Sequence, residues 1–489
     1  MRFNIKNRIA NITTRYAAVI LVLVGMVLSG CEKYLDDTQL PANRVAVADV
    51  YLTDGTTSTA VTGIFLSLTI AGAFNPSSGN NIGFTTGLYS DELKALVPGN
   101  FADVFYKNTI QTGQSPFWND FYKKIFVCNT AIAGINSSKG ALQYKDQWLG
   151  ECYFLRALFY YNLVNFYGDV PLALTDDYKV NNVLPRAPQA EVFQQIIADL
   201  KQAQALLSTD YRNGLGLPTT NRLRPNKAAA TALLARAYLY AKEWANAEAA
   251  ASTLIEDANY KLLPLAQVFV ANSQEQIWSL AYATARVSAE YGFYTNGMPS
   301  TLPTAAAISN SPYVIFAAIN TPLLNAFTPG DGRLTNWMRT TTVTTVPAVT
   351  YYFPNKYKSA VAGADVQVML RLGEQYLIRA EARAMQNKAT AVDDVNAIRT
   401  RAGGIPLLAA STPQTTLLTA IAKERQTELF TESAHRFFDL KRTGVIDDVM
   451  KSVSTVKGSV WASYMSLWPI PPSESIQNPN ITPNPGYLQ

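Results

Sequence analysis

Two segments of the chain repeat one pattern, a pair of amphipathic helices joined by a short turn. The first pair is predicted within residues 226–260, where Ala235 and Ala247 fall on two successive apolar stripes. The second is predicted within residues 370–404. Its stripes carry Leu372, Tyr376 and Ala380, then Ala391, Val395 and Ile398. A pair of this kind buries its apolar face only by stacking on neighbouring helices. The chain is therefore expected to fold around stacked helices.

Other helices are predicted beside these pairs. Residues 117–135 place apolar side chains three or four positions apart, and residues 147–167 are apolar around most of a helix, with Gly168 as the expected stop. Residues 192–207 form a further predicted helix. The offsets in residues 226–260 are those of a tetratricopeptide unit. The predicted fold class is mainly α, a scaffold of tetratricopeptide-like helix pairs.

Two long stretches, residues 71–114 and 282–363, show no sustained period and are expected to be irregular loops. They are rich in Gly, Pro, Asn, Ser and Thr, yet they carry many aromatic residues, which argues against disorder. One interpretation is a ligand-binding surface. The other is that the rings only pin the loops to the scaffold. The candidate ligand-binding residues are Asn81, Phe101, Tyr291, Tyr294, Asn296, Tyr313 and Trp337.

The N-terminus has the pattern of a secretory signal, residues 1–30. Basic residues come first, and an apolar run of about 12 residues follows, short of the about 20 that a membrane-spanning helix needs. The run ends Leu-Ser-Gly-Cys, which looks like a lipobox and predicts lipid attachment at Cys31. An ordinary cleaved signal is the alternative. Residues 31–43 then form a tether, and residues 44–489 a single domain.

Composition excludes several functions. Removing the four basic residues of the signal leaves 37 basic and 36 acidic residues, so no case for nucleic-acid binding remains. His435 is the only histidine, which excludes multi-histidine metal sites, and no phosphate-binding loop of Walker type is present. No cofactor, metal or catalytic residue is predicted. Cys128 and Cys152 either form one disulfide or are two buried thiols.

A charged run, Glu424–Gly444, invites an enzymatic interpretation. Glu428 and Glu432 lie one helical turn apart, close to His435, and could form an acid/base pair. The alternating signs and the neighbouring rings favour a structural interpretation instead. On that view the run is one helix whose charges pair with each other while its rings pack inward.

Six blocks in order carry a resemblance to a known family. They are FLRALFYYNLVNFYGDVPL (154–172), NKAAATALLARAYLYAKEW (226–244), LRLGEQYLIRAEARA (370–384), NAIRTRAG (396–403), ERQTELFTESAHRFFDLKRTG (424–444) and LWPIPPSESIQNPNITPNPGY (467–487). Together they resemble the SusD/RagB outer-membrane lipoproteins of Bacteroidetes. Two departures are Ala434, where the charged block commonly has Gly, and Pro483, where the tail often has Gln.

The resemblance implies a nutrient-binding protein without catalytic activity. Such a protein is attached by lipid to the outer membrane, faces the cell exterior, and passes its ligand to a SusC-like TonB-dependent transporter. The leading hypothesis is an oligosaccharide ligand, and a peptide, as in the RagB branch, is the alternative. A glycan-cleaving surface enzyme is the third hypothesis, for which no distinctive carboxylate motif is present.

Replacing Cys31 with Ala tests the predicted lipid anchor. Because the thiol that accepts the lipid is lost, the variant is expected in the soluble fraction, folded and able to bind ligand but unable to support uptake. Cell fractionation and an uptake assay measure both outcomes. A soluble variant that still supports full uptake would contradict the link between anchor and function.

Overall fold

A computed structural model shows that the residues from Tyr51 onward pack together as one unit. It describes residues 49–70, 72–75, 81–281, 294, 297–310, 315–361 and 364–487. The predicted signal and tether, residues 1–43, lie outside the described residues, as do Cys31, Tyr291, Asn296 and Tyr313. No helix in the described ranges has both the length and the apolar composition needed to cross a bilayer.

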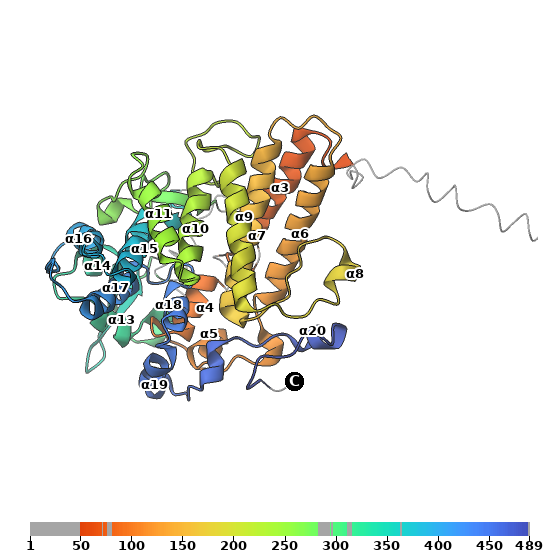
Figure 1. Cartoon of the computed structure of the whole chain (residues 1–489). Helices are drawn as coiled ribbons and strands as arrows, with labels where there is room; N and C mark the ends of the chain where they lie inside the picture. The colour runs from red at the N-terminus through yellow and green to blue at the C-terminus, as the bar shows by residue number, and fades with distance from the viewer. Residues whose placement is uncertain are drawn as a thin grey trace, which may run out of the picture. The chain divides into compact units, whose positions relative to one another are not determined.

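Long helices lying side by side form the scaffold (Figure 1). They are α3 (Asp54–Ile70), α6 (Trp118–Ser137), α7 (Lys145–Tyr167), α9 (Gln189–Leu206), α10 (Lys227–Tyr240), α11 (Trp244–Ile255), α15 (Leu372–Met385), α16 (Ala391–Ala402) and α17 (Gln414–Glu428). From α6 to α11 each helix packs on the next, α11 packs on α15, and α15 packs on both α16 and α17. The predicted scaffold of stacked helix pairs is confirmed.

Helices α10–α11 and α15–α16 are the two predicted pairs. Ala235 and Ala247 are both fully buried, and α10 packs closely on α11. The distance between two packed helices depends on the side chains at the contact, so two alanines let the backbones approach. The second pair buries Ala391, Val395 and Ile398 in the same way.

Helix α7 is buried around nearly its whole circumference, as its composition predicts. It lies between α6 and α9, so its apolar residues meet a neighbour on each side. The helix ends at Gly168, whose φ of 76° lies in the left-handed region that glycine adopts without strain.

The two stretches predicted to be irregular contain short elements between their loops. Residues 71–114 contain α4 (Ile82–Tyr89), β1 (Leu93–Ala95), α5 (Phe101–Tyr106) and the 3₁₀ turn η2 (Thr112–Gln114). Residues 282–363 contain β3 (Thr301–Leu302), α12 (Ala306–Ser309), β4 (Ala317–Ile319), α13 (Thr321–Ala326), α14 (Gly332–Asn336), β5 (Met338–Val343) and β6 (Val349–Pro354). Elements this short carry too few residues to show a period in sequence.

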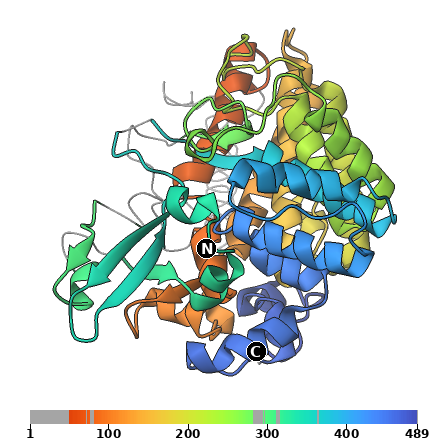
Figure 2. The ribbon, with the colours of Figure 1, turned by 90° about the vertical axis from the view of Figure 1, so that its left-hand side faces the viewer.

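The strands form three small sheets. Strand β1 pairs antiparallel with β4, which joins the two stretches: Leu93 lies opposite Ile319 and Ala95 opposite Ala317. Strand β2 (Gln276–Leu280) pairs with β7 (Gln367–Arg371), and β5 lies between β3 and β6. Figure 2 shows the β5–β6 hairpin to the left and the scaffold helices to the right.

The charged run is broken into two helices, contrary to the prediction of one. Helix α17 ends at Glu428, and α18 (His435–Arg442) begins after a tight turn. Thr431, Ser433 and Ala434 in this turn have φ values of 59°, 44° and 65°. The left-handed backbone at Ala434 explains why glycine suits this position.

The remaining elements are α8 (Tyr178–Asn181), η3 (Leu265–Gln267), α19 (Ile446–Lys457), η5 (Ser463–Ser466) and α20 (Pro472–Gln477).

The acidic residues of the run pair mainly with other elements, which also corrects the prediction of internal pairing. Glu428 is fully buried and accepts hydrogen bonds from Arg371 Nη1 at 2.6 Å, from Arg333 Nη1 at 3.2 Å and from Arg401. Glu432 binds Arg371 Nε at 2.8 Å. Burial raises the pKa of Glu428, but the three guanidinium groups outweigh this and hold the pKa well below its usual range.

Both internal cysteines are free and buried, so of the two alternatives the structure has the buried thiols. Cys128 lies on α6 and Cys152 on α7. Burial raises the pKa of Cys128 to about 12 and raises that of Cys152 as well. Both side chains therefore pack as small apolar groups.

Replacing Arg371 with Met tests how far the fold depends on the buried charges. The substitution leaves Glu428 and Glu432 with fewer partners in the interior, so we expect a loss of about 3–5 kcal/mol in the free energy of unfolding. Chemical denaturation measures the loss. Lys388→Met is the matched control, since the Lys388 side chain is 47% exposed and pairs with Glu248 at the surface. This variant should lose less than about 1 kcal/mol in the free energy of unfolding. Equal losses in the two variants would contradict the prediction.

Candidate ligand-binding face

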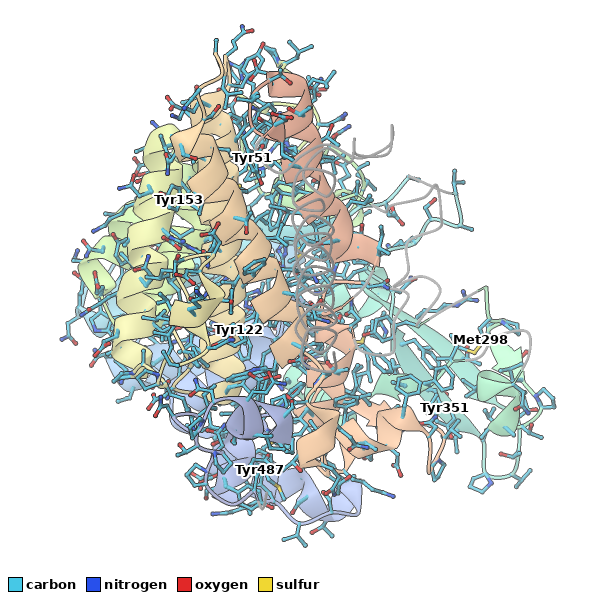
Figure 3. All side chains as sticks on the ribbon, turned by 90° about the vertical axis from the view of Figure 1, so that its right-hand side faces the viewer. Tyr51, Tyr122, Tyr153, Met298, Tyr351 and Tyr487 are labelled. Carbon is cyan, nitrogen blue, oxygen red and sulfur yellow. The ribbon has the colours of Figure 1, made fainter. Side chains whose placement is uncertain are left out.

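The short elements of these two stretches lie on one side of the scaffold, and we call residues 81–106, 297–310 and 315–354 the loop face (Figure 2). In Figure 3, Tyr351 lies on the sheet at the right of the view and Met298 lies on the same side, whereas Tyr153 of α7 lies toward the left. The loop face has a small apolar core of its own, formed by Met298, Leu302, Ile308, Ile315, Ala318, Val343 and Phe353.

Asparagine caps begin both α4 and α5. The Asn81 side-chain oxygen accepts hydrogen bonds from the amides of Gly83 at 3.0 Å and Phe84 at 3.3 Å. Asn100 does the same at the start of α5. These caps satisfy amides that have no partner within the helix. Asn81 is 6% exposed and its oxygen is already used by α4, and its ligand-binding role stays a prediction.

Two of the predicted aromatic residues meet in a row of rings. The Phe84 ring centroid lies 6.1 Å from that of Tyr294 and 6.1 Å from that of Phe101, and Phe101 lies 5.2 Å from Phe316, edge to face. We call Tyr294, Phe84, Phe101 and Phe316 the aromatic row. Phe101 is 40% exposed, whereas Tyr294 is only 2% exposed. Phe101 is thus the most exposed ring of the row.

Trp337, another of the predicted ligand-binding residues, does not belong to this row. The side chain is fully buried, and its Nε1 donates to the Leu265 carbonyl at 3.0 Å. The ring packs on Phe269, and the Lys356 ammonium lies 4.9 Å from its centroid. The tryptophan therefore shields the buried charges rather than offering a platform at the surface.

Contacts with the C-terminal region hold α4 in place. Lys457, on α19, donates to the carbonyls of Leu88, Tyr89 and Ser90 at 2.9, 3.0 and 2.7 Å, where α4 ends. An ammonium at a helix C-terminus meets unpaired carbonyls and the negative end of the helix dipole. A Cβ at Gly83 would lie 2.3 Å from the Thr431 carbonyl oxygen, so only glycine permits this approach.

The two acids after α4 join the loop face to the charged run. Asp91 binds Arg436 through two hydrogen bonds of 2.8 and 2.7 Å. Glu92 is 3% exposed, and its Oε2 accepts from the Thr431 amide at 3.3 Å. Burial, and secondly the Asp91 carboxylate, raise the pKa of Glu92 to about 8. Glu92 is therefore mostly protonated at neutral pH.

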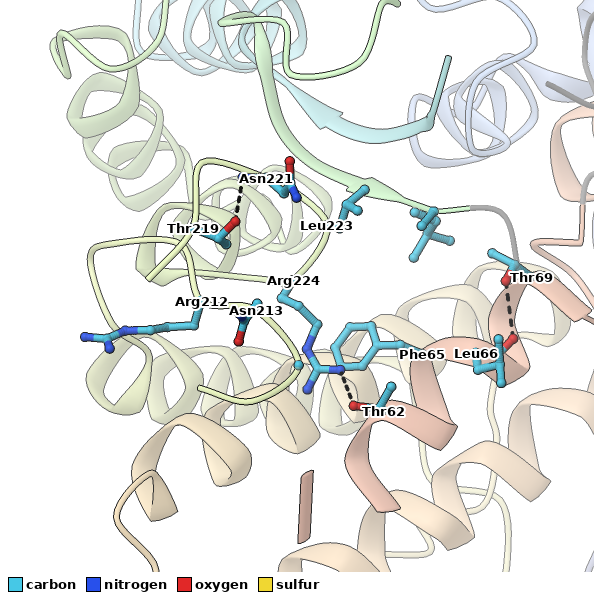
Figure 4. A pocket seen from close by; sticks show the side chains of 13 residues that line it. Thr62, Phe65, Leu66, Thr69, Arg212, Asn213, Thr219, Asn221, Leu223 and Arg224 are labelled. Atoms are coloured by element: carbon cyan, nitrogen blue, oxygen red, sulfur yellow. Dashed lines mark hydrogen bonds between the residues drawn. The ribbon is translucent and has the colours of Figure 1, made fainter. Parts of the chain in front are cut away.

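A pocket of about 340 Å³ lies beside the N-terminal helix α3 (Figure 4). Phe65 and Leu223 form part of an apolar wall, and Asn213 and Asn221 add amide groups. The Arg224 guanidinium lies 4.2 Å from the Phe65 ring centroid and donates from Nη1 to Thr62 Oγ1 at 3.1 Å. An apolar hollow with a few polar groups suits a small polar ligand with an apolar face.

The residues suspected of acid/base chemistry are held in the interior. Glu428 and Glu432 are ion-paired, as described above, and His435 is 4% exposed. Burial, with the neighbouring arginines, lowers the pKa of His435 well below its usual value, so the ring is neutral. No group of three or more potential metal ligands occurs in the part of the chain that the structure describes. These residues stabilise the fold.

Sequence reasoning missed several residues of this side of the molecule, among them Phe65, Phe84 and Phe316. For Phe84 a signal existed, since Asn81 precedes a short apolar run as an N-cap does. Phe65 and Phe316 lie in segments whose partners are remote in sequence, and no local pattern marks them.

Replacing Glu92 with Gln tests the buried environment just before β1. The folded state raises the pKa of Glu92 from 4.5 to about 8, so its contribution to stability is fully present below pH 4.5 and is lost as the pH rises toward 8. Gln cannot ionise. The variant should therefore gain stability relative to the wild type over this window, by about 4 kcal/mol at most. Denaturation at several pH values measures the difference in the free energy of unfolding between the variant and the wild type. The contributions of titrating groups that both proteins share cancel in this difference. A difference that stays constant from pH 5 to 8 would contradict the expected pKa.

Comparisons with known proteins agree on the family. The family model described as "Starch-binding associating with outer membrane" matches residues 98–239, and the model described as "SusD family" matches residues 338–487. SusD-like protein P2 of Formosa agariphila is 26% identical over 422 residues, which cover 76% of this chain and 80% of that protein. SusD-like protein P38 of the same organism is 24% identical, with 76% and 79% covered.

Solved structures show the same fold. A SusD superfamily protein from Bacteroides vulgatus superposes with a TM-score of 0.74 at 20% identity, covering 89% of this chain and 99% of that one. A structure described as a laminarin binding SusD-like protein gives a TM-score of 0.72 at 24% identity, covering 89% and 100%. On the matches in both halves of the chain and on this fold, the chain belongs to the SusD/RagB family.

Proposed function

We propose that this protein is a glycan-binding lipoprotein of the outer-membrane surface. It captures an oligosaccharide on the loop face and delivers it to a SusC-like TonB-dependent transporter. The lipobox pattern at Cys31 supports attachment by lipid, and the family description supports the outer membrane and a glycan ligand. A relative of the same fold is described as binding laminarin.

The observation that carries the proposal is the exposed end of the aromatic row. Phe101 is 40% exposed, and its position is fixed by packing against Phe84 and Phe316. A ring held in this way offers a flat apolar surface on which the CH face of a sugar can stack, at little loss of side-chain freedom.

Polar groups of the loop face would set the orientation of the sugar. Lys94, on β1, lies with its ammonium 4.9 Å from the Tyr351 ring centroid, and both side chains are partly exposed. The Lys94 ammonium can donate to sugar hydroxyls, and the Tyr351 hydroxyl can donate or accept. Together with Phe101 they provide the mixed apolar and polar lining that small-ligand sites have.

A hydrolytic activity is not part of the proposal. The acids of the charged run are buried and paired with arginine or lysine, so they present no carboxylate to a bound glycan. Binding and hand-over need only a surface that holds the ligand reversibly.

Replacing Phe101 with Ala tests the loop face as the binding site. Loss of one stacking ring should weaken glycan binding by about 1–3 kcal/mol, by analogy with bases stacked on aromatic side chains. A glycan array first identifies the ligand, and calorimetry then compares the variants. Phe126→Ala is the matched control, because Phe126 is 47% exposed on α6, outside the loop face. It should bind as the wild type does.

A peptide-pool pulldown run beside the array separates the two ligand classes. Binding of peptides with no binding of any saccharide would contradict the glycan proposal. Glycan binding that is equal in the wild type and the Phe101→Ala variant would place the site elsewhere.

A further inference from the structure

Large apolar side chains are exposed on α6 and on the segment that runs from Pro171 through α8. Helix α6 lies at one end of the helix row, where it packs on α3 and α7, and α8 projects beside it (Figure 1). We call the exposed apolar side chains the α6–α8 face, and none of them belongs to the loop face. They are 39% to 63% exposed: Phe126, Val127, Leu174, Tyr178, Val180 and Val183.

Hydrogen bonds hold the segment after Pro171 against one stripe of α6. The Tyr122 hydroxyl donates to the Pro171 carbonyl at 2.9 Å, and Asn129 Nδ2 donates to the Thr175 carbonyl at 3.0 Å. Residues three and four apart are neighbours on one side of a helix, so Phe126 lies on this stripe between Tyr122 and Asn129. The segment therefore runs past the Phe126 ring.

Helix α8 folds back onto the same segment. Asn181 Nδ2 donates to the Thr175 carbonyl at 2.7 Å, the carbonyl that Asn129 also contacts. The exposed side chains of α8 are therefore held close to those of α6. Grouped apolar exposure of this kind marks a surface that contacts a protein or a membrane.

The exposed charges around this face balance. Among residues 122–129 and 171–183 the exposed charged side chains are two lysines and two aspartates: Lys123, Lys179, Asp176 and Asp177. Whatever covers the face is therefore held by apolar contact rather than by net charge.

The chain enters the domain on the side of this face. Tyr51 begins the packed unit; its ring lies against Gly134 of α6, and its carbonyl accepts a hydrogen bond from Ser138. Gly134 follows Phe126 by about two helical turns, about 12 Å along the axis. The predicted lipid site, Cys31, precedes Tyr51 by 20 residues, which span at most about 70 Å. A lipid at Cys31 therefore keeps a bilayer within reach of this side of the domain.

We propose that the α6–α8 face rests in the interfacial layer of the bilayer that holds the anchor, an inference that depends on the proposed lipid attachment at Cys31. Phe126 and the aliphatic side chains enter the boundary between headgroups and acyl chains, and the Tyr178 hydroxyl stays among the headgroups. In Figure 3, Tyr122 of α6 faces the viewer, whereas Tyr351 of the loop face lies to the right. The loop face therefore stays open to glycans while the α6–α8 face is covered.

Fluorescence quenching on the mature, lipidated chain in phosphatidylcholine vesicles tests the proposal. An environment-sensitive dye is attached through Val183→Cys, and the vesicle lipids carry a nitroxide near the headgroups. Cys128 and Cys152 are buried, so they should not react with the dye. The dye at position 183 should lose most of its fluorescence because the nitroxide lies beside it.

A dye attached through Leu407→Cys is the matched control. Leu407 is 58% exposed and Val183 is 60% exposed, but Leu407 lies between α16 and α17, away from the α6–α8 face. The control dye should keep nearly all of its fluorescence. Both chains carry the same anchor, so a difference between them reports orientation and not attachment alone.

Two further substitutions identify the side chains responsible. Adding Phe126→Ser and Tyr178→Ser to the Val183→Cys chain should reduce its quenching to the level of the Leu407→Cys chain, because the apolar contact with the bilayer is lost. Adding Leu215→Ser and Val460→Ser instead is the matched control, since both residues are exposed and apolar but lie outside the face. That chain should be quenched as before, and circular dichroism shows whether each variant is folded.

Two results would overturn the proposal: equal quenching at positions 183 and 407, or quenching at position 183 that persists after Phe126→Ser and Tyr178→Ser. Sedimentation tests a second copy as the occupant. Dimers of the Cys31→Ala chain that dissociate on these two substitutions would assign the face to self-association and overturn the membrane contact.

Failure of this proposal can be told apart from failure of the proposed function. Mass spectrometry shows whether Cys31 carries lipid. A chain without lipid overturns the proposed anchor and this inference together, whereas a lipidated chain with equal quenching overturns this inference alone. Glycan binding by the loop face is measured separately and does not depend on either result.

Discussion

The carboxylate of Glu428 is the point where the scaffold and the loop-face elements are joined. It lies at the end of α17 and is shared by guanidiniums from α14, from the end of β7 and from α16: Arg333, Arg371 and Arg401. A buried charge is tolerated only when it is paired and hydrogen-bonded. Because one carboxylate serves three partners, the position of each of these elements depends on the other two.

The turn that follows Glu428 extends this dependence to the loop face. Its left-handed residues bring the Thr431 carbonyl against Gly83 and the Thr431 amide against Glu92. On the far side of the turn, Arg436 binds Asp91. Helix α4 and strand β1 are therefore fastened to the charged turn, and the aromatic row is positioned through them.

The sequence was sufficient to predict the scaffold because its helices are long and repeat their apolar positions. Helix α6, with Phe121 and Ile125 fully buried, is an example. The charged run shows the limit of such reasoning. The alternation of positive and negative residues predicted that the charges of this run are paired. However, Arg371 lies 57 residues from Glu428 along the chain, and no local pattern identifies a partner so far away.

Exposure within the aperiodic stretches could not be predicted from the sequence. Phe101 and Trp337 both lie among polar and turn-forming residues, yet one is at the surface and the other is fully buried. What separates them is tertiary packing. Trp337 is covered by side chains that include Lys356 and Phe269, whereas Phe101, the first residue of α5, packs on Phe84 and Phe316 and stays 40% exposed.

Helix α4, capped by Asn81 at its start and by Lys457 at its end, has its shape before any ligand arrives. A binding surface formed in advance loses little conformational entropy when it is occupied. Related ligands would then bind this surface with similar association rates and differ mainly in their dissociation rates. On the proposed function the protein must also release what it captures, so the residence time of the ligand becomes the property on which selection acts.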